Sequence, residues 1–262
     1  MHIDTAARLV DLNHQFYQSF ASAFAATRRR IQPGVRRIIQ QLPLDGNWLD
    51  LGCGSGALAA DWARAGRKGS YLGLDFSAEL LEEARRGLPQ TLPENLKVDF
   101  SFANLVEPGW PGKLPQQSFN GVLAFAVLHH LPGLELRTRV MRQVHSLLVP
   151  GGLFIHSNWQ FQHSPRLMAR RQPWQTVGLA EADVEAGDTL LDWRYTLPGE
   201  AERTGLRYVH LFSRLELEEL AALTGFDIFE EFESDGEGGR LGLYQTWRVN
   251  SSIQGLNQTP SI

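Results

Sequence analysis

The sequence contains a single cysteine, Cys53, among its 262 residues. One cysteine excludes an intramolecular disulfide, and we expect no metal site in this chain. Cys53 lies between two glycines, where a small side chain fits. We therefore predict that it packs in a turn and does not act as a nucleophile.

Long apolar runs and a basic leader are also absent. The longest apolar stretch, Val122–Val127, is far too short to cross a bilayer. The N-terminus lacks the basic region followed by an apolar core that is typical of a signal peptide. We therefore predict a soluble, cytoplasmic protein without a membrane partner.

Neither sign of charge dominates the composition. The chain has 25 Lys and Arg against 29 Asp and Glu, a formal net charge of −4. This balance gives no general support for nucleic-acid binding, although it allows a local basic patch. With 43% hydrophobic residues, a chain of this length can form one globular core domain and one elaboration.

A glycine-rich turn after an apolar run is the strongest signal that the sequence does contain. Trp48–Leu51 predicts a strand, and Gly52, Gly54 and Gly56 follow it directly. A second apolar run ends at Asp75, nineteen residues after Gly56. This layout is typical of a nucleoside-binding crevice, because glycines admit a ligand close to the backbone and an acid can accept ribose hydroxyls. The Gly-x-Gly-x-Gly spacing differs from the dinucleotide fingerprint and disfavours NAD.

Strands and helices alternate through the first part of the chain and then stop doing so. Apolar strands are predicted at 48–51, 70–74, 97–102, 121–127 and 153–157. The segment 158–207 lacks clear periodicity, which predicts an inserted, partly helical lid that binds substrate. The segments 226–233 and 241–249 predict a closing β-hairpin. The expected parts are an N-terminal helical cover (1–45), a core (46–157 and 208–249), the lid (158–207) and a disordered tail (250–262).

Four motifs in this order resemble those of the class I S-adenosylmethionine-dependent methyltransferases. They are the run 49–56, Asp75, Val127–Leu131 and Pro150–Gly152. The resemblance covers roughly residues 10 to 249. It implies an α/β fold with a doubly wound, mostly parallel seven-stranded sheet of the Rossmann-like methyltransferase type, a C-terminal antiparallel β-hairpin and a lid inserted after the fifth strand. It also implies S-adenosylmethionine as the cofactor and S-adenosylhomocysteine as its product.

The resemblance implies roles for residues of the glycine turn and of the strand ends. Gly52, Gly54 and Gly56 would lie against the methionine and ribose parts of the cofactor, and Asp75 would accept the ribose hydroxyls. Its further cofactor contacts would be Phe76, Asn104, Leu105 and Phe125. The family often has an aspartate where this chain has Asn104, whose amide oxygen can still accept a hydrogen bond.

Two adjacent histidines follow the predicted fourth strand. His129 and His130 would face the acceptor, and either could serve as a base if the acceptor must lose a proton. Both could equally be structural groups or pack against the cofactor.

Beyond the core, the chain resembles the branch that esterifies carboxymethyl-uridine at the tRNA wobble position. The matching elements are Phe16-Tyr17 with 24–28, His129-His130, Trp159, 187–194 and 207–212. The resemblance implies that Tyr17 and Arg28 close over the cofactor, although they could instead belong to a plain cover helix. The acceptor would be bound by Trp159, Arg194, Arg207, Tyr208 and His210, with Trp174 and Trp193 as further stacking candidates.

Three hypotheses about function remain open at this point. The leading one is a methyltransferase acting on a carboxylate or other oxygen of a tRNA wobble uridine. The second is a methyltransferase for a small carboxylic or hydroxylated metabolite, and the third is a non-catalytic activator subunit that keeps the fold. A small activator protein is a candidate partner of the enzyme itself.

Overall fold

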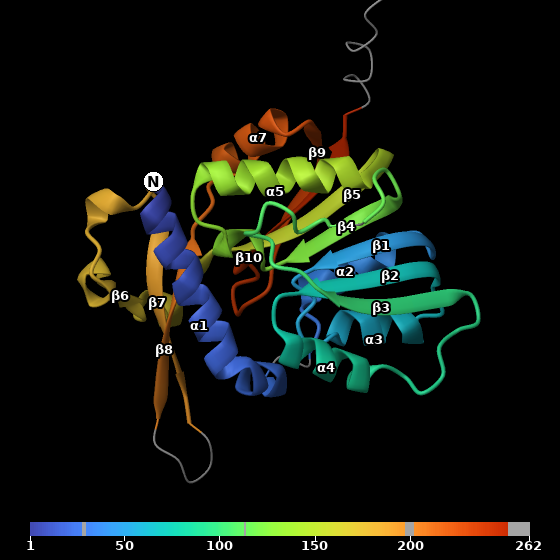
Figure 1. Cartoon of the computed structure of the whole chain (residues 1–262), viewed down its shortest axis with the longest axis horizontal. Coiled ribbons are helices and arrows are strands. Elements are labelled where there is room, and N and C mark those ends of the chain that lie inside the picture. The colour runs from blue at the N-terminus through green and yellow to red at the C-terminus, as the bar shows by residue number, and fades with distance from the viewer. Residues whose placement is uncertain (28–29, 113, 197–201, 251–262) are drawn as a thin grey trace, which may run out of the picture.

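The computed structural model describes residues 1–27, 30–112, 114–196 and 202–250. A seven-stranded sheet forms the core, in the order β3-β2-β1-β4-β5-β10-β9 (Figure 1). Its strands are β1 (Asp45–Leu51), β2 (Lys68–Asp75), β3 (Leu96–Phe102), β4 (Phe119–Phe125), β5 (Leu148–Trp159), β9 (Phe226–Ser234) and β10 (Gly242–Val249). The first five are parallel, and β10 runs antiparallel to β5 and β9. The doubly wound sheet with its terminal hairpin is therefore confirmed.

Helices cover both faces of this sheet, as its two apolar faces require. They are α2 (Pro33–Gln41), α3 (Ala57–Arg64), α4 (Ala78–Gly87), α5 (Leu134–Leu147) and α7 (Arg214–Leu223). One core cluster contains Val144 of α5 and Leu217 of α7. The other contains Ile38 of α2, Trp62 of α3 and Leu81 of α4, so these three helices lie on the opposite face (Figure 1).

The insertion after β5 is built around a second sheet, not mainly around helices. It contains β6 (Arg171–Gln172), β7 (Asp188–Tyr195), β8 (Arg203–His210) and the short helix α6 (Pro165–Met168). The three strands are antiparallel, in the order β6-β7-β8. The first five residues of β7, 188–192, are all buried, so the polar–apolar alternation that would have predicted a strand is missing. Because β8 continues to His210, this sheet also crosses the expected boundary at residue 208.

The N-terminal helix α1 (Ile3–Thr27) lies along β8, beside the second sheet (Figure 1). Leu9, Phe16 and Phe20 are buried on one face of α1. Asn13 lies on the same face and bonds the main chain of Tyr208: its Oδ1 accepts from the nitrogen at 2.8 Å and its Nδ2 donates to the oxygen at 3.1 Å. A polar residue on the buried face of α1 thus satisfies backbone groups of an edge strand.

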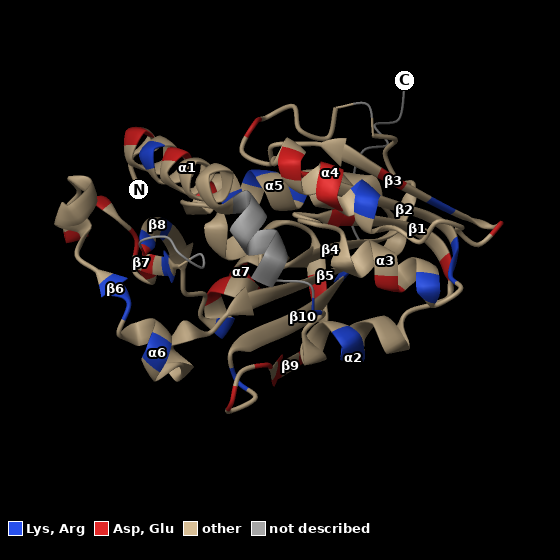
Figure 2. Ribbon diagram, turned by 90° about the horizontal axis from the view of Figure 1, so that it is seen from below, with Lys and Arg blue, Asp and Glu red and all other residues tan. Residues whose placement is uncertain are grey.

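The charged residues are spread over the surface of the described chain (Figure 2). None of the helices in the described ranges is both long and apolar enough to cross a membrane. Asn250 donates from its main-chain nitrogen to Gly225 at 3.0 Å. The rest of the expected tail, 251–262, lies outside the described residues.

Candidate active site

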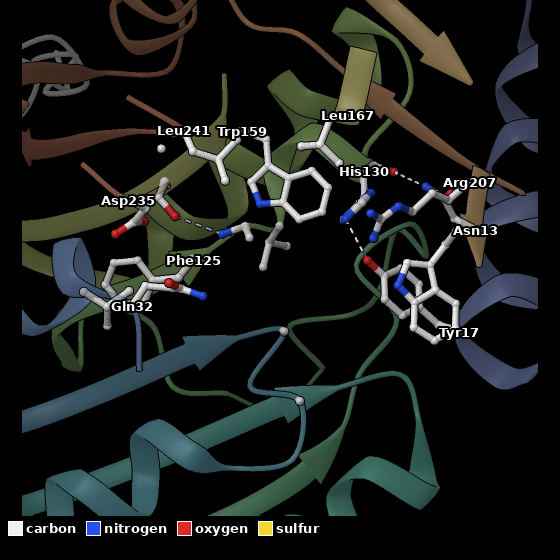
Figure 3. A pocket seen from close by; sticks show the side chains of 18 of the residues that line it. Asn13, Tyr17, Gln32, Phe125, His130, Trp159, Leu167, Arg207, Asp235 and Leu241 are labelled. Atoms are coloured by element: carbon white, nitrogen blue, oxygen red, sulfur yellow. Dashed lines mark hydrogen bonds between the residues drawn. The ribbon is translucent and has the colours of Figure 1, made fainter. Parts of the chain in front are cut away.

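A cleft of about 1240 Å³ lies at the carboxyl ends of β1, β2 and β4, bounded by α1 and the insertion (Figure 3). This is the edge where open α/β sheets bind ligands. The volume exceeds the roughly 300–1,000 Å³ of a pocket for one drug-sized molecule. The cleft is therefore larger than a single drug-sized molecule requires.

The glycine turn after β1 forms the floor of the cleft. Gly52 and Gly54 have φ of +67° and +55°, the left-handed region in which glycine is favoured. A Cβ on Gly52 would lie 2.6 Å from Val127, whereas one on Gly54 would meet nothing within 4 Å. Gly54 thus presents bare backbone to the cleft. Gly56, by contrast, packs against Ala84 of α4 and is not among the lining residues.

Asp75 ties the glycine turn to the end of β2. Its Oδ2 accepts from the main-chain nitrogen of Gly54 and its Oδ1 from that of Ser77, each at 2.9 Å. Burial raises the pKa of the carboxyl, although backbone donors at Ser77, Gly54 and Phe76 counteract part of the rise. Asp75 therefore lines the cleft with both oxygens already held in fixed directions.

Other predicted cofactor contacts also lie on the walls of the cleft, namely Tyr17, Phe76, Asn104, Leu105 and Phe125. The ring of Phe76 lies 4.7 Å from that of His14 and 5.9 Å from that of Tyr17. Asn104 accepts from the nitrogen of Val106 at 3.4 Å. Arg28 lies outside the described residues.

The two histidines occupy different environments. The Nδ1 of His130 is 3.1 Å from the carbonyl oxygen of Tyr208, and its Nε2 is 2.7 Å from the hydroxyl of Tyr17 (Figure 3). A carbonyl cannot donate, so a proton on Nδ1 satisfies this contact. When Nε2 carries no proton, it can accept from the hydroxyl of Tyr17. His129 is fully buried, and its Nδ1 accepts from the nitrogen of Trp159 at 3.3 Å. Of the pair, His130 is the one that lines the cleft.

Arginines and a tryptophan from β5, β7 and β8 form the wall opposite the glycine turn (Figure 3). The guanidinium of Arg207 is only 3% exposed and lies 4.5 Å above the ring of Trp159. Arg194 donates from Nε to the buried carboxylate of Asp192 at 3.0 Å. This wall therefore combines positive charge with a flat aromatic surface.

Tyr208 and His210 are not part of this wall, and their contact with an acceptor stays a prediction. Both are fully buried on the face of β8 opposite to Arg207, because side chains alternate along a strand. The hydroxyl of Tyr208 donates to Asp188 at 2.7 Å, and His210 Nδ1 lies 2.6 Å from the same carboxylate. Trp174, a further stacking candidate, is likewise buried in an apolar cluster with Leu9 of α1.

Glu185, Asp188 and His210 have the side-chain types of a metal site. The guanidinium of Arg137 lies among them, however, 3.2 Å from Glu185 and 3.8 Å from Asp188. Arg137 supplies the positive charge that these carboxylates need.

Comparison with known proteins shows the family to which this chain belongs. Residues 23–231 match the methyltransferase domain family. The chain belongs to this family. The methyltransferase is 26% identical to the tRNA (carboxymethyluridine(34)-5-O)-methyltransferase of Schizosaccharomyces pombe, over 83% of this chain and 89% of that protein.

Other known proteins match a shorter part of this chain or are similar to it in structure. A probable tRNA methyltransferase 9B of Bos taurus is 25% identical over 66% of this chain, which spans about a third (35%) of that protein. A SAM-dependent methyltransferase of Methanosarcina mazei superposes with a TM-score of 0.59 at 22% identity, over 84% of this chain and 98% of the other. A methyltransferase of Haloferax volcanii, solved in complex with the Trm112 activator, has the same TM-score at 16% identity, over 90% and 96%. The last two likenesses show the fold.

The methyltransferase has cleft residues that the sequence interpretation missed. Asp50 lines the cleft at the end of β1, and a carboxylate inside an otherwise apolar strand could have indicated it. Asn13 and His14 reach the cleft from α1, and a polar residue on the buried face of a helix was a usable signal for Asn13. Asp235, from the β9–β10 turn, gave no such signal. Its Oδ1 accepts from the main-chain nitrogen of Gly34, 201 residues away in sequence.

Proposed function

We propose that this methyltransferase takes its methyl group from S-adenosylmethionine and esterifies the carboxymethyl group of a tRNA wobble uridine. The name and extent of the fission-yeast relative support the substrate, since that similarity spans most of both chains. The observation that carries the proposal is the pairing of two unlike walls in one cleft. Gly54 and Asp75 line one side, and Arg207 on Trp159 lines the other.

The residues of the first wall fit S-adenosylmethionine. Gly54 offers open space where a side chain would stand, beside the fixed carboxylate of Asp75. We assign the ribose to Asp75, the adenine to Phe76 with Asn104, and the methionine part to Gly52 and Gly54. When bound, the cofactor supplies an electrophilic methyl group on a sulfonium.

The second wall suits an acceptor that carries a carboxylate. A carboxyl group with an ordinary pKa near 4 is ionised at neutral pH, so it needs no general base before it reacts. The task of the protein is then to hold the acceptor in line, and Arg207 can orient a carboxylate by charge-assisted hydrogen bonds. We therefore assign His130 and Tyr17 to shaping the cleft, and Trp159 to contact with the uracil ring.

The test is nucleoside analysis of tRNA from a strain that lacks this gene. We expect unmethylated carboxymethyl-uridine to accumulate, and purified protein with S-adenosylmethionine to convert it to the ester. An unchanged wobble-uridine profile would exclude this acceptor.

A small carboxylic metabolite is the second candidate acceptor, because Arg207 lies deep in the cleft at 3% exposure. Transfer to small acids without transfer to tRNA would support it. Calorimetry with S-adenosylmethionine tests both candidates together, because an intact protein that shows no measurable binding would contradict either methyl transfer.

We also propose that a small activator protein binds the methyltransferase, on the precedent of the Haloferax volcanii complex. Affinity purification of the full chain from its own cells, followed by mass spectrometry, tests this. Recovery of the fully active chain without a bound partner would contradict this proposal.

A further inference from the structure

A row of flat groups leads from the cleft out along the β7–β8 hairpin. It begins at Trp159 and Arg207, whose guanidinium lies 5.4 Å from the ring of Phe16. The Phe16 ring is 5.9 Å from that of Trp193 and nearly perpendicular to it. Trp193 and Tyr195 then lie parallel, with ring centroids 5.2 Å apart and planes inclined by 6°.

The strand register explains why these groups share one face. Trp193 and Tyr195 are two residues apart on β7, so both side chains point the same way. Their partners on β8 are Gly205 and Arg203. A Cβ on Gly205 would lie 2.4 Å from Phe20, so glycine lets α1 close against the hairpin beside Trp193. Tyr195, further out, stays partly exposed next to the exposed Arg203.

The charge around this row is suited to a polyanion. Arg166 on α6, Arg171 on β6 and Arg203 on β8 are exposed on the insertion (Figure 2). Arg194, also exposed, is paired with Asp192 and lies 3.8 Å from Glu202. Glu185, which precedes β7, and Asp188, its first residue, are engaged with Arg137.

We propose that Trp193 and Tyr195, flanked by Arg203, form a stacking platform for an RNA base neighbouring the one that enters the cleft. Unpaired bases stack on aromatic rings and on guanidinium planes, while arginines contact the phosphates between them. Trp193 holds the Tyr195 ring in a fixed plane, and the incoming base adds to this stack. The inference rests on the proposed function, because it assumes an RNA acceptor at Trp159 and Arg207.

The test measures binding of an anticodon stem–loop RNA, and methylation of tRNA, by variants of the full chain. Tyr195→Ala removes the exposed ring without touching the packing of Trp193 on Phe16 and Phe20. We expect it to raise the Kd for the RNA about tenfold, with unchanged affinity for S-adenosylmethionine. Tyr195→Phe keeps the ring and is expected to restore most of the affinity.

Phe229→Ala is the matched control. Phe229 is 60% exposed on β9, at the far edge of the core sheet, and Arg248 lies 4.0 Å above its ring. This variant removes another aromatic ring that is accessible to solvent and lies beside an arginine, and it should leave RNA binding as it is.

The two proposals fail in different ways. If the wild type methylates tRNA but Tyr195→Ala binds RNA as tightly as the wild type, or no more weakly than Phe229→Ala, the platform is wrong and the function stands. If the wild type neither binds nor methylates tRNA, the proposed function fails and the platform fails with it.

Discussion

Asp50 and Cys53 are titratable groups buried beside the glycine turn, and burial affects their protonation in the same direction. Burial raises the pKa of Asp50 to about 7, against the hydrogen bond from Tyr71 and with help from the charge of Asp75. Burial also raises the pKa of the Cys53 thiol, and the two aspartates add to the rise. A thiol kept protonated is a poor nucleophile, which agrees with the expected packing role of Cys53.

The raised pKa of Asp50 leads to a prediction about stability. Between the unfolded value of 3.8 and about 7 the folded state holds a proton that the unfolded state releases. The contribution of Asp50 to stability is therefore complete below 3.8, falls as pH rises towards about 7 and changes little above that. Asp50→Asn, which has no charge to bury, should show a flatter dependence of the urea midpoint on pH between about 4 and 7. The exposed Asp99→Asn on β3 is the control, and an equal flattening there would contradict the assignment.

At the scale of elements, a buried ionic cluster joins the two sheets. Arg137 of α5 lies 3.2 Å from Glu185, 3.8 Å from Asp188 of β7 and 4.0 Å from Glu216 of α7. It also donates to the hydroxyl of Tyr208 on β8 at 3.1 Å. The carbonyl of Tyr208 in turn holds Nδ1 of His130. The cluster that fixes the insertion to the core thereby helps to orient a side chain of the cleft.

Arg137→Met should destabilise the fold by about 3–5 kcal/mol, because it takes the buried guanidinium away from the buried carboxylate of Asp188. Arg142→Met, on the exposed face of the same helix, should change stability by less than about 0.5 kcal/mol. Urea unfolding of both variants measures the difference. Similar losses in the two would show that the cluster is not a structural anchor.

For the whole molecule, the cluster and Asp50 together set the pH of greatest stability. Burial lowers the pKa of His210, but hydrogen bonds to Asp188 and Glu216 outweigh it and raise the pKa above 6.5. Burial raises the pKa of Glu216, yet the bonds from His210 and Ser213 bring it down to about 2. The contribution of His210 to the free energy of unfolding is complete below pH 6.5 and is lost as the pH rises through the raised pKa of the histidine. Stability from Glu216 is complete above 4.5 and is lost as pH falls towards about 2.

Glu216 and His210 predict a stability maximum at mildly acidic pH. It should lie between the pKa values that the two side chains have in the unfolded chain, 4.5 for Glu216 and 6.5 for His210. Asp50 acts in the same sense, since its contribution declines as pH rises from 3.8 to about 7 and so favours the acidic end of this range. Thermal unfolding across a pH series measures the profile, and a maximum above about pH 8 would contradict it.

The sequence predicted the core well because most of its strands contain apolar runs or apolar alternation, and several turns and helix ends carry residues with a local conformational preference. The glycines after β1 and the capping box at Ser213 are of this kind. It failed in the insertion, where burial comes from contacts with distant elements. Tyr208 and Arg207 are adjacent in sequence, but one faces the ionic cluster and the other the cleft. Whether Arg207 or Tyr208 faces the cleft depends on how β8 pairs with β7, and the sequence alone does not show this pairing.

The link between Asn13 and Tyr208 spans 195 positions of the chain. During synthesis α1 leaves the ribosome well before β8, so its apolar face has no β8 to pack against until the residues between them have been made. At roughly 5–20 residues per second, that interval lasts about 10 to 40 seconds. The wall that carries Arg207 is therefore completed late, and the nascent chain cannot bind an acceptor while its core sheet is still assembling.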